Sequence, residues 1–181
     1  KIDNVYIVSN AVKYLQDEEV PDTGADRLTA RLEKNEAEGM QFIVKPNQTI
    51  SNVKMTVSEL KDGQGNQFAA ENVEAFRQYY IDTQPTSPEY ESVSGMIPDA
   101  LIPLVYEDLN SVDVEAGKNQ GFWITVTAPK DQPAGVYTGS VTLTYDGGVT
   151  EIPVEVEVWD FELPDEPSFA SAYGLWDSNA W

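Results

Sequence analysis

The segment VYTGSVTLTYDGGVTEIPVEVEVW, residues 136–159, decides the fold class. Its apolar side chains stand at alternate positions on both sides of a central turn: Tyr137, Val141, Leu143 and Tyr145 before it, and Val154, Val156 and Val158 after it. Alternation with a period of two is typical of a strand with one buried face. The turn is Asp146-Gly147-Gly148, in which glycine supplies the positive φ that a tight turn requires. The segment therefore predicts a β-hairpin.

The same alternation runs through the rest of the chain, and no stretch has the apolar spacing of an amphipathic helix over three turns. Met40, Phe42 and Val44, for example, share one side of a predicted strand. Eight strands are expected: 5–9, 27–32, 39–45, 52–58, 73–81, 121–128, 136–145 and 149–159. We predict an all-β fold, a two-sheet antiparallel β-sandwich of the immunoglobulin-like or jelly-roll-like kind.

Two segments interrupt the alternation and are expected to be surface loops, residues 82–98 and 128–135. The last expected strand ends at Val158, and residues 161–167 resemble a linker because they hold two prolines. We predict a sandwich domain over residues 1–160, followed by a linker and the start of another domain over residues 161–181. The final stretch is too apolar for a free tail, since it contains the aromatic residues Phe169, Tyr173, Trp176 and Trp181.

Composition excludes several classes of function. The 181 residues include 31 acidic and 11 basic side chains, a formal charge of −20 that repels nucleic acid and anionic lipid. No apolar run reaches the about 20 residues that span a bilayer. The chain has neither cysteine nor histidine, so we expect no disulfide, no thiolate or imidazole catalysis, no metal and no cofactor. The absence of cysteine fits an exported bacterial protein, and we expect a secreted or cell-surface location.

The carboxylates do not form a recognisable active site, and we predict no catalytic residue in this chain. Glu155 and Glu157 alternate with valines and are expected on the solvent face of a strand. The sequence Asp62-Gly-Gln-Gly-Asn66 resembles the start of a calcium loop, but no bidentate glutamate follows, so a hairpin turn is the favoured interpretation. Gly117, Gly135 and Gly139 are interpreted as turn or close-approach positions. The amides of Asn119 and Gln120 are expected to bond backbone groups.

Two tryptophans fall on the polar side of their strands, Trp123 beside Thr125 and Trp159 beside Glu155. A large aromatic side chain on a solvent face is typical of an interface or of a sugar-stacking platform. Docking against a following domain is the favoured explanation for Trp159, whereas for Trp123 docking and a wrongly assigned strand phase are equally open. The candidate interdomain contacts are Trp159, Phe161, Trp123 and Trp176.

Five segments resemble, in order, the N-terminal domain of glycoside hydrolase family 123-like proteins, many of which carry the module called DUF4091. They are KNEAEGMQFIVKP (34–46), IPDALIPL (97–104), AGKNQGFWITV (116–126), PAGVYTGSV (133–141) and VWDFELP (158–164). Together they cover most of the chain from residue 34 to residue 164.

This resemblance implies that the chain leads into a (β/α)8 barrel, outside this sequence, that would hold an adjacent Asp-Glu pair. Characterised members resemble retaining β-N-acetylgalactosaminidases in which the acetamido oxygen of the substrate attacks the anomeric carbon. The expected function is a non-catalytic accessory domain that packs against this barrel and shapes it. The alternatives are an autonomous carbohydrate-binding module, with glycan as its ligand, and an immunoglobulin-like adhesion spacer.

Overall fold

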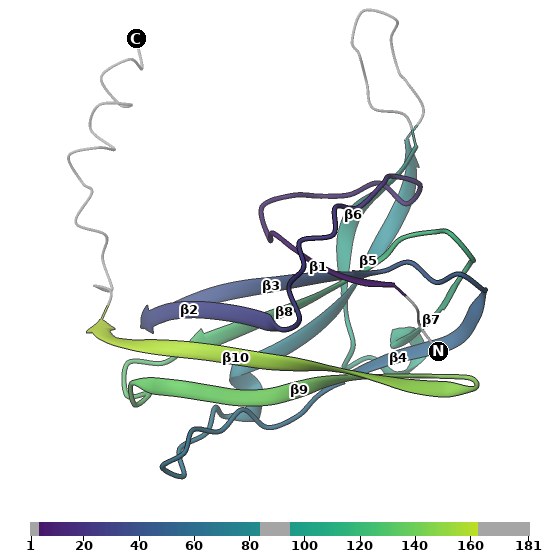
Figure 1. The fold of residues 1–181 in the computed structure, drawn as a ribbon. Helices are drawn as coiled ribbons and strands as arrows, with labels where there is room; N and C mark the ends of the chain where they lie inside the picture. The colour runs from purple at the N-terminus through teal and green to yellow at the C-terminus, as the bar shows by residue number, and fades with distance from the viewer. Residues whose placement is uncertain (1–3, 84–94, 163–181) are drawn as a thin grey trace, which may run out of the picture.

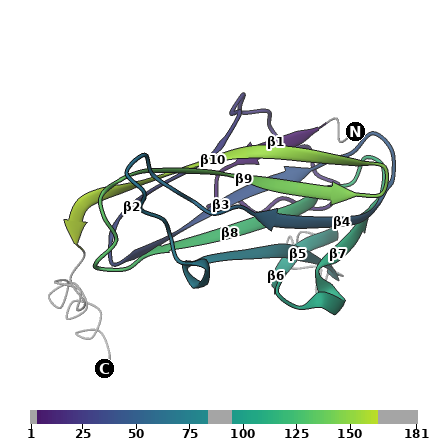
Figure 2. The same cartoon turned by 90° about the horizontal axis from the view of Figure 1, so that it is seen from below.

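A computed structural model describes residues 4–83 and 95–162, which form two five-stranded sheets packed face to face (Figure 1, Figure 2). Sheet A has the order β1 (Val5–Val8), β3 (Glu36–Val44), β8 (Gln120–Ala128), β5 (Val73–Thr83) and β6 (Gly95–Pro103). Sheet B has the order β2 (Leu28–Lys34), β10 (Gly148–Glu162), β9 (Gly135–Tyr145), β4 (Ile50–Val57) and β7 (Ser111–Val114). Two 3₁₀ turns, Ala70–Asn72 and Glu107–Leu109, complete the described elements. The predicted two-sheet β-sandwich is confirmed.

The β-hairpin predicted from residues 136–159 is confirmed. β9 and β10 pair antiparallel from Gly148 opposite Tyr145 to Val158 opposite Gly135. Gly147 has a φ of 95° in the connecting turn, a conformation that favours glycine. Val154, Val156 and Val158 are buried on the inner face, whereas Glu155 and Glu157 lie on the outer face, as expected.

The core is built from the inner faces of both sheets, where alternating apolar residues meet. Phe42 of β3 stacks on Phe122 of β8 with ring centroids 5.2 Å apart. Phe68, from the connection between β4 and β5, meets the edge of Tyr137 at 4.8 Å. The Tyr137 hydroxyl donates to the Pro133 carbonyl at 2.6 Å, so this ring buries its apolar body and still satisfies its polar end.

The expectation of eight strands is wrong by two, because β6 and β7 were missed. β6 begins at Gly95, inside the segment that was expected to be a loop up to residue 98. It contains Pro98 and Pro103 and lies at the edge of sheet A, where proline is tolerated because one side of the strand needs no ladder bond. β7 has only four residues, too few to show a period. The expected loop over residues 128–135 is confirmed between β8 and β9.

One pairing departs from the antiparallel pattern. β2 pairs parallel with β10, from Leu28 opposite Val154 to Leu32 opposite Val158. The chain then passes from sheet B to sheet A through a tight turn at Asn35, whose φ is 66°. β10 also runs to Glu162, which pairs with Lys34, so the strand includes Phe161, which was predicted to belong to a linker.

The outer face of sheet A is covered by the segment between β1 and β2. Val8, Val20 and Ile43 form a small second core there. Below this segment a buried network of amides joins β5 and β3 to the chain after β1: the Gln78 amide donates to Gln41, whose own amide donates to the Ser9 and Val12 carbonyls. A side chain in this network cannot lose its partner without leaving a buried polar group unsatisfied.

The start of β8 completes this network. Asn119 donates to the carbonyls of Leu15 and Glu18, at 2.8 and 2.7 Å, and Gln120 donates to the carbonyl of Gln78 at 2.8 Å. The prediction that both amides bond backbone groups is confirmed. The Gly121 amide donates to the Tyr80 hydroxyl at 2.8 Å, and burial raises the pKa of that hydroxyl well above its ordinary value.

Candidate interdomain surface

Two exposed aromatic rings lie next to each other at the end of β10. Trp159 is 40% exposed and Phe161 is 64% exposed, and their rings meet edge to face with centroids 6.5 Å apart. Both follow Val158, where the pairing with β9 ends, and precede Glu162, where the pairing with β2 resumes after a register shift. Neither ring therefore lies opposite a paired residue of β9. The outward position predicted for Trp159 is confirmed.

A shallow hollow beside these rings is lined by residues 134–136 and 157–161. The exposed side chain of Val136 lines this hollow, and Gly135 has no side chain that would fill the hollow. Lys34 and Asp160 form an ion pair at 3.1 Å next to the hollow. We call Trp159, Phe161 and Val136 the exit patch, because they surround the point at which the chain leaves the sandwich.

Trp123 has a different setting. It lies on the outer face of sheet A, so the strand phase predicted from the sequence is correct. Its ring lies against Gly39 of β3, where a Cβ would clash with the ring atoms, and its Nε1 donates to Thr125 Oγ1 at 3.0 Å. The side chain is half-buried against its own sheet, and its docking to another domain stays a prediction. Trp176 lies outside the described residues.

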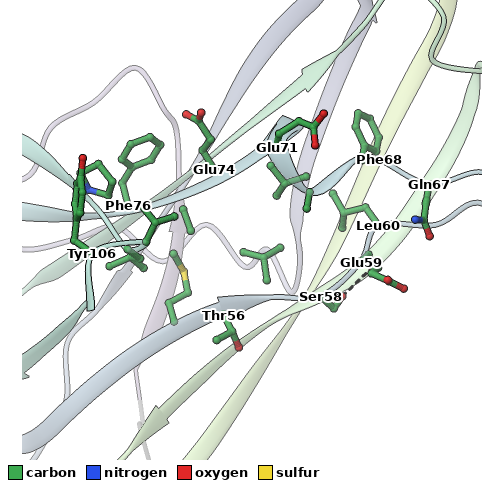
Figure 3. Close-up of a pocket in the computed structure, with 18 residues that line it drawn as sticks. Thr56, Ser58, Glu59, Leu60, Gln67, Phe68, Glu71, Glu74, Phe76 and Tyr106 are labelled. Carbon is green, nitrogen blue, oxygen red and sulfur yellow. Dashed lines mark hydrogen bonds between the residues drawn. The ribbon is translucent and has the colours of Figure 1, made fainter. Parts of the chain in front are cut away.

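The structure also has a groove of about 770 Å³ between β4 and β5, which the sequence did not predict. Figure 3 shows Leu60 and Phe68 at one end and Phe76 and Tyr106 at the other. Glu71 and Glu74 stand along the β5 side. An alternating apolar pattern does not predict this groove, because the groove lies between strands of two different sheets.

A hairpin at residues 61–67 separates the groove from the exit patch. Asp62 accepts the amides of Gln64 and Asn66 at 2.9 and 2.8 Å with one oxygen, and the side-chain amide of Asn66 with the other. These hydrogen bonds lower the pKa of the Asp62 carboxyl, and the bond from the Asn66 side chain has the largest effect. Both oxygens therefore accept hydrogen bonds within the turn, and the predicted hairpin turn is confirmed. Across the described ranges no three acidic side chains gather as a metal site would require.

The comparisons with known proteins agree with this architecture. The family model described as glycoside hydrolase 123 N-terminal domain matches residues 7–145. The chain belongs to this family. The resemblance drawn from the five sequence segments is thereby confirmed. No curated protein matches the sequence.

The family 123 N-terminal domain also resembles solved structures. A family 123 glycoside hydrolase from Clostridium perfringens, studied for glycolipid glycan hydrolysis, aligns with a TM-score of 0.70 and 17% identity. The alignment covers 89% of this chain but 28% of that enzyme, so the chain spans less than a third of its length. The CooA pilin subunit from enterotoxigenic Escherichia coli aligns with a TM-score of 0.38 and 15% identity, over 88% of this chain and 99% of that one.

Three of the segments that carry the family resemblance meet at one end of this domain, which we call the exit end. The turn at Asn35, the loop before Gly135 and the end of β10 lie together there, because Val158 pairs with Gly135 and Glu162 pairs with Lys34. The Asn35 amide also donates to the Ala128 carbonyl at 2.8 Å. Figures 1 and 2 show the end of β10 at this same end of the sandwich. No helix of the described chain is long and apolar enough to cross a membrane.

Proposed function

We propose that this chain is the non-catalytic accessory domain of a longer glycoside hydrolase, and that it docks on a following catalytic barrel through the exit patch. The observation that carries the proposal is the position of Trp159 and Phe161, two exposed rings between Val158 and Glu162, the last two residues of β10 that pair with β2. Membership of family 123 and the coverage of 28% of the Clostridium perfringens enzyme support the existence of a larger protein.

Physical chemistry favours a covered exit patch. Fully burying a large apolar side chain stabilises a protein by about 1.5–3 kcal/mol. Trp159 and Phe161 are still exposed, so much of this stabilisation would be gained only when another surface covers them. Tryptophan and tyrosine anchors with a polar rim are characteristic of stable interfaces. The ion pair of Lys34 and Asp160 supplies such a rim at the edge of the patch.

The proposed substrate class follows from the same relationship. The relative from Clostridium perfringens was studied for glycolipid glycan hydrolysis, and we extend a glycan substrate to the longer protein of which this domain is a part. A β-N-acetylgalactosaminide is the specific expectation. The domain contributes to this activity by holding the barrel and shaping it. Export to the cell surface or the medium belongs to the same proposal.

Replacing Trp159 and Phe161 together with alanine tests the docking. In the 181-residue chain the free energy of unfolding should change by less than about 1 kcal/mol, because neither ring belongs to the main core. In the longer protein the same double variant should lower the unfolding temperature of the sandwich, since two interface anchors are lost. Differential scanning calorimetry on both lengths measures the two effects.

Val149→Ala is the matched control, because Val149 is 65% exposed on β10 beside the turn at the opposite end of the hairpin. This control should leave the unfolding temperature of both the 181-residue chain and the longer protein unchanged. Hydroxyl-radical footprinting adds a direct readout: Trp159 should be labelled several-fold less in the longer protein, whereas Tyr79, exposed on β5, should be labelled equally. Equal labelling of Trp159 in both lengths would contradict the docking surface.

A further inference from the structure

The sequence contains two Asp-Gly pairs, Asp62-Gly63 and Asp146-Gly147, and no Asn-Gly pair. Both pairs lie in turns, the first in the hairpin at residues 61–67 and the second between β9 and β10. Because glycine has no Cβ, its main-chain nitrogen is open to the side-chain carboxyl of the preceding aspartate. The two pairs are therefore alike in their local chemistry, and the structure decides whether they react alike.

The Asp62 carboxyl is held by three hydrogen bonds. Its Oδ1 accepts the main-chain amides of Gln64 and Asn66 at 2.9 and 2.8 Å, and its Oδ2 accepts the Asn66 side-chain amide at 2.8 Å. Attack on Cγ would make this planar group tetrahedral and expel one of its oxygens, so the bonds must break first. They also lower the pKa of this carboxyl and favour the carboxylate, whereas loss of water requires the neutral acid.

The Asp146 carboxyl has a more open setting. It is exposed and accepts one side-chain amide, from Asn52 at 3.5 Å, beyond the usual range of about 2.7–3.2 Å. Among the described residues no ion pair involves Asp146. No atom beyond the chain neighbours lies within 4 Å of a Cβ built at Gly147, so the following residue is open as well. The carboxyl can rotate toward the Gly147 nitrogen without breaking a strong contact.

We propose that Asp146 is a site of spontaneous isoaspartate formation, and that the hydrogen-bonded turn at Asp62 suppresses the same reaction there. In the first step the Gly147 nitrogen forms a bond to Asp146 Cγ. The side-chain hydroxyl leaves as water with the amide proton, and a five-membered succinimide results. In the second step water adds to the main-chain carbonyl carbon of Asp146 and breaks its bond to the Gly147 nitrogen, which takes a proton. The chain then runs through Cγ, and the mass is unchanged.

The product would alter the turn itself. Isoaspartate adds one carbon to the main chain directly before Gly148, which with Tyr145 forms the first pair of the β9–β10 ladder. The Asp146 amide donates to the Ser51 carbonyl at 3.0 Å, so the change also affects the contact of this turn with β4. Figure 1 shows this turn at the end of the sandwich opposite the end of β10. The inference is therefore independent of the exit patch.

Prolonged incubation of the folded 181-residue chain at neutral pH tests the proposal. Endoproteinase Asp-N cuts before aspartate but not before isoaspartate, so peptide mapping measures each site separately. The uncut fraction at Asp146 should grow about ten-fold faster than at Asp62, because three hydrogen bonds to a carboxylate must open at Asp62. Methyl transfer from S-adenosylmethionine by an isoaspartyl methyltransferase provides a second readout.

Incubation in urea separates the effect of the fold from that of the local sequence. With both turns unfolded, the two rates should agree within about three-fold, because the protection comes from native hydrogen bonds. In the folded chain Asn66→Ala removes the bond to Asp62 Oδ2 and should raise the rate at Asp62 several-fold without changing Asp146. Gln64→Ala is the matched control, since it keeps the main-chain amide that Asp62 accepts and should leave both rates unchanged.

Two results would overturn the proposal. The first is equal or faster reaction at Asp62 in the folded chain. The second is isoaspartate at Asp146 in urea but not in the folded chain, which would show that this turn is protected as well. Neither result depends on glycosidase activity or on shielding of Trp159, so the proposed function is tested separately.

Discussion

Phe42→Ala lowers the free energy of unfolding of the sandwich by about 3–5 kcal/mol, the largest effect expected of any single substitution considered. The Phe42 side chain is completely buried and stacks on Phe122 at 5.2 Å with an interplanar angle of 18°. Removal of the ring leaves a cavity between the two sheets that β3 cannot close, because that strand is held by ladders to β1 and β8 on either side.

Urea unfolding of the 181-residue chain, followed by circular dichroism, measures this effect. Val149→Ala is again the control, since an exposed side chain away from special backbone features changes stability by less than about 0.5 kcal/mol. A loss below about 1 kcal/mol for Phe42→Ala would show that the two sheets do not pack around this ring.

Gly139→Ala should destabilise the domain by about 1–3 kcal/mol, although alanine is the better strand residue by conformational entropy. A Cβ at Gly139 would lie 2.6 Å from Ser58 Oγ and 2.7 Å from both the Glu59 carbonyl oxygen and Leu60 Cδ2. One of these three atoms belongs to the backbone, so the strain cannot be relieved by a side-chain rotation alone. The segment after β4 must move away from β9 instead.

Gly63→Ala provides the comparison for Gly139→Ala in the same unfolding experiment. No atom beyond the chain neighbours lies within 4 Å of a Cβ built at Gly63, so this variant should be neutral. Equal stability of the two variants would mean that residues 58–60 do not lie against β9 as described.

Much of this architecture could be predicted because alternation is a local signal. The β9–β10 hairpin, the inner face of β3 and the outward position of Trp159 each follow from which residues stand two apart. The close approach at Gly139 was predicted for a similar reason, since glycine inside a strand marks a place where another backbone or side chain approaches. These features depend on short stretches of sequence.

The features that the sequence did not predict depend on distant partners. β6 contains two prolines, which are compatible with a strand only because it lies at a sheet edge. The parallel pairing of β2 with β10 joins residues 126 positions apart at Leu28 and Val154. The groove lies between β4 of sheet B and β5 of sheet A, so it depends on how the two sheets pack. No local pattern carries this information.

The same distinction applies to the candidate surface. Trp159 and Phe161 were named as candidate contacts from the sequence, Trp159 because of its phase beside Glu155 and Phe161 although it was assigned to the linker. Val136 was missed, although it is exposed beside them, because a valine in an alternating strand gives no sign that its outer face is open. Trp123 shows the opposite case: its outward phase was correct, but the absence of a side chain on Gly39 gives its ring partial cover within sheet A.

The most direct test of the central claim is hydrolysis of aryl N-acetylhexosaminides by the 181-residue chain and by the protein that continues past Trp181. The two proteins are compared at equal molar concentration on the same panel, which includes the β-N-acetylgalactosaminide. Cleavage by the longer protein alone is the predicted result and assigns the chemistry to the following domain. Cleavage by the 181-residue chain would contradict the accessory role and place catalytic carboxylates within the sandwich itself.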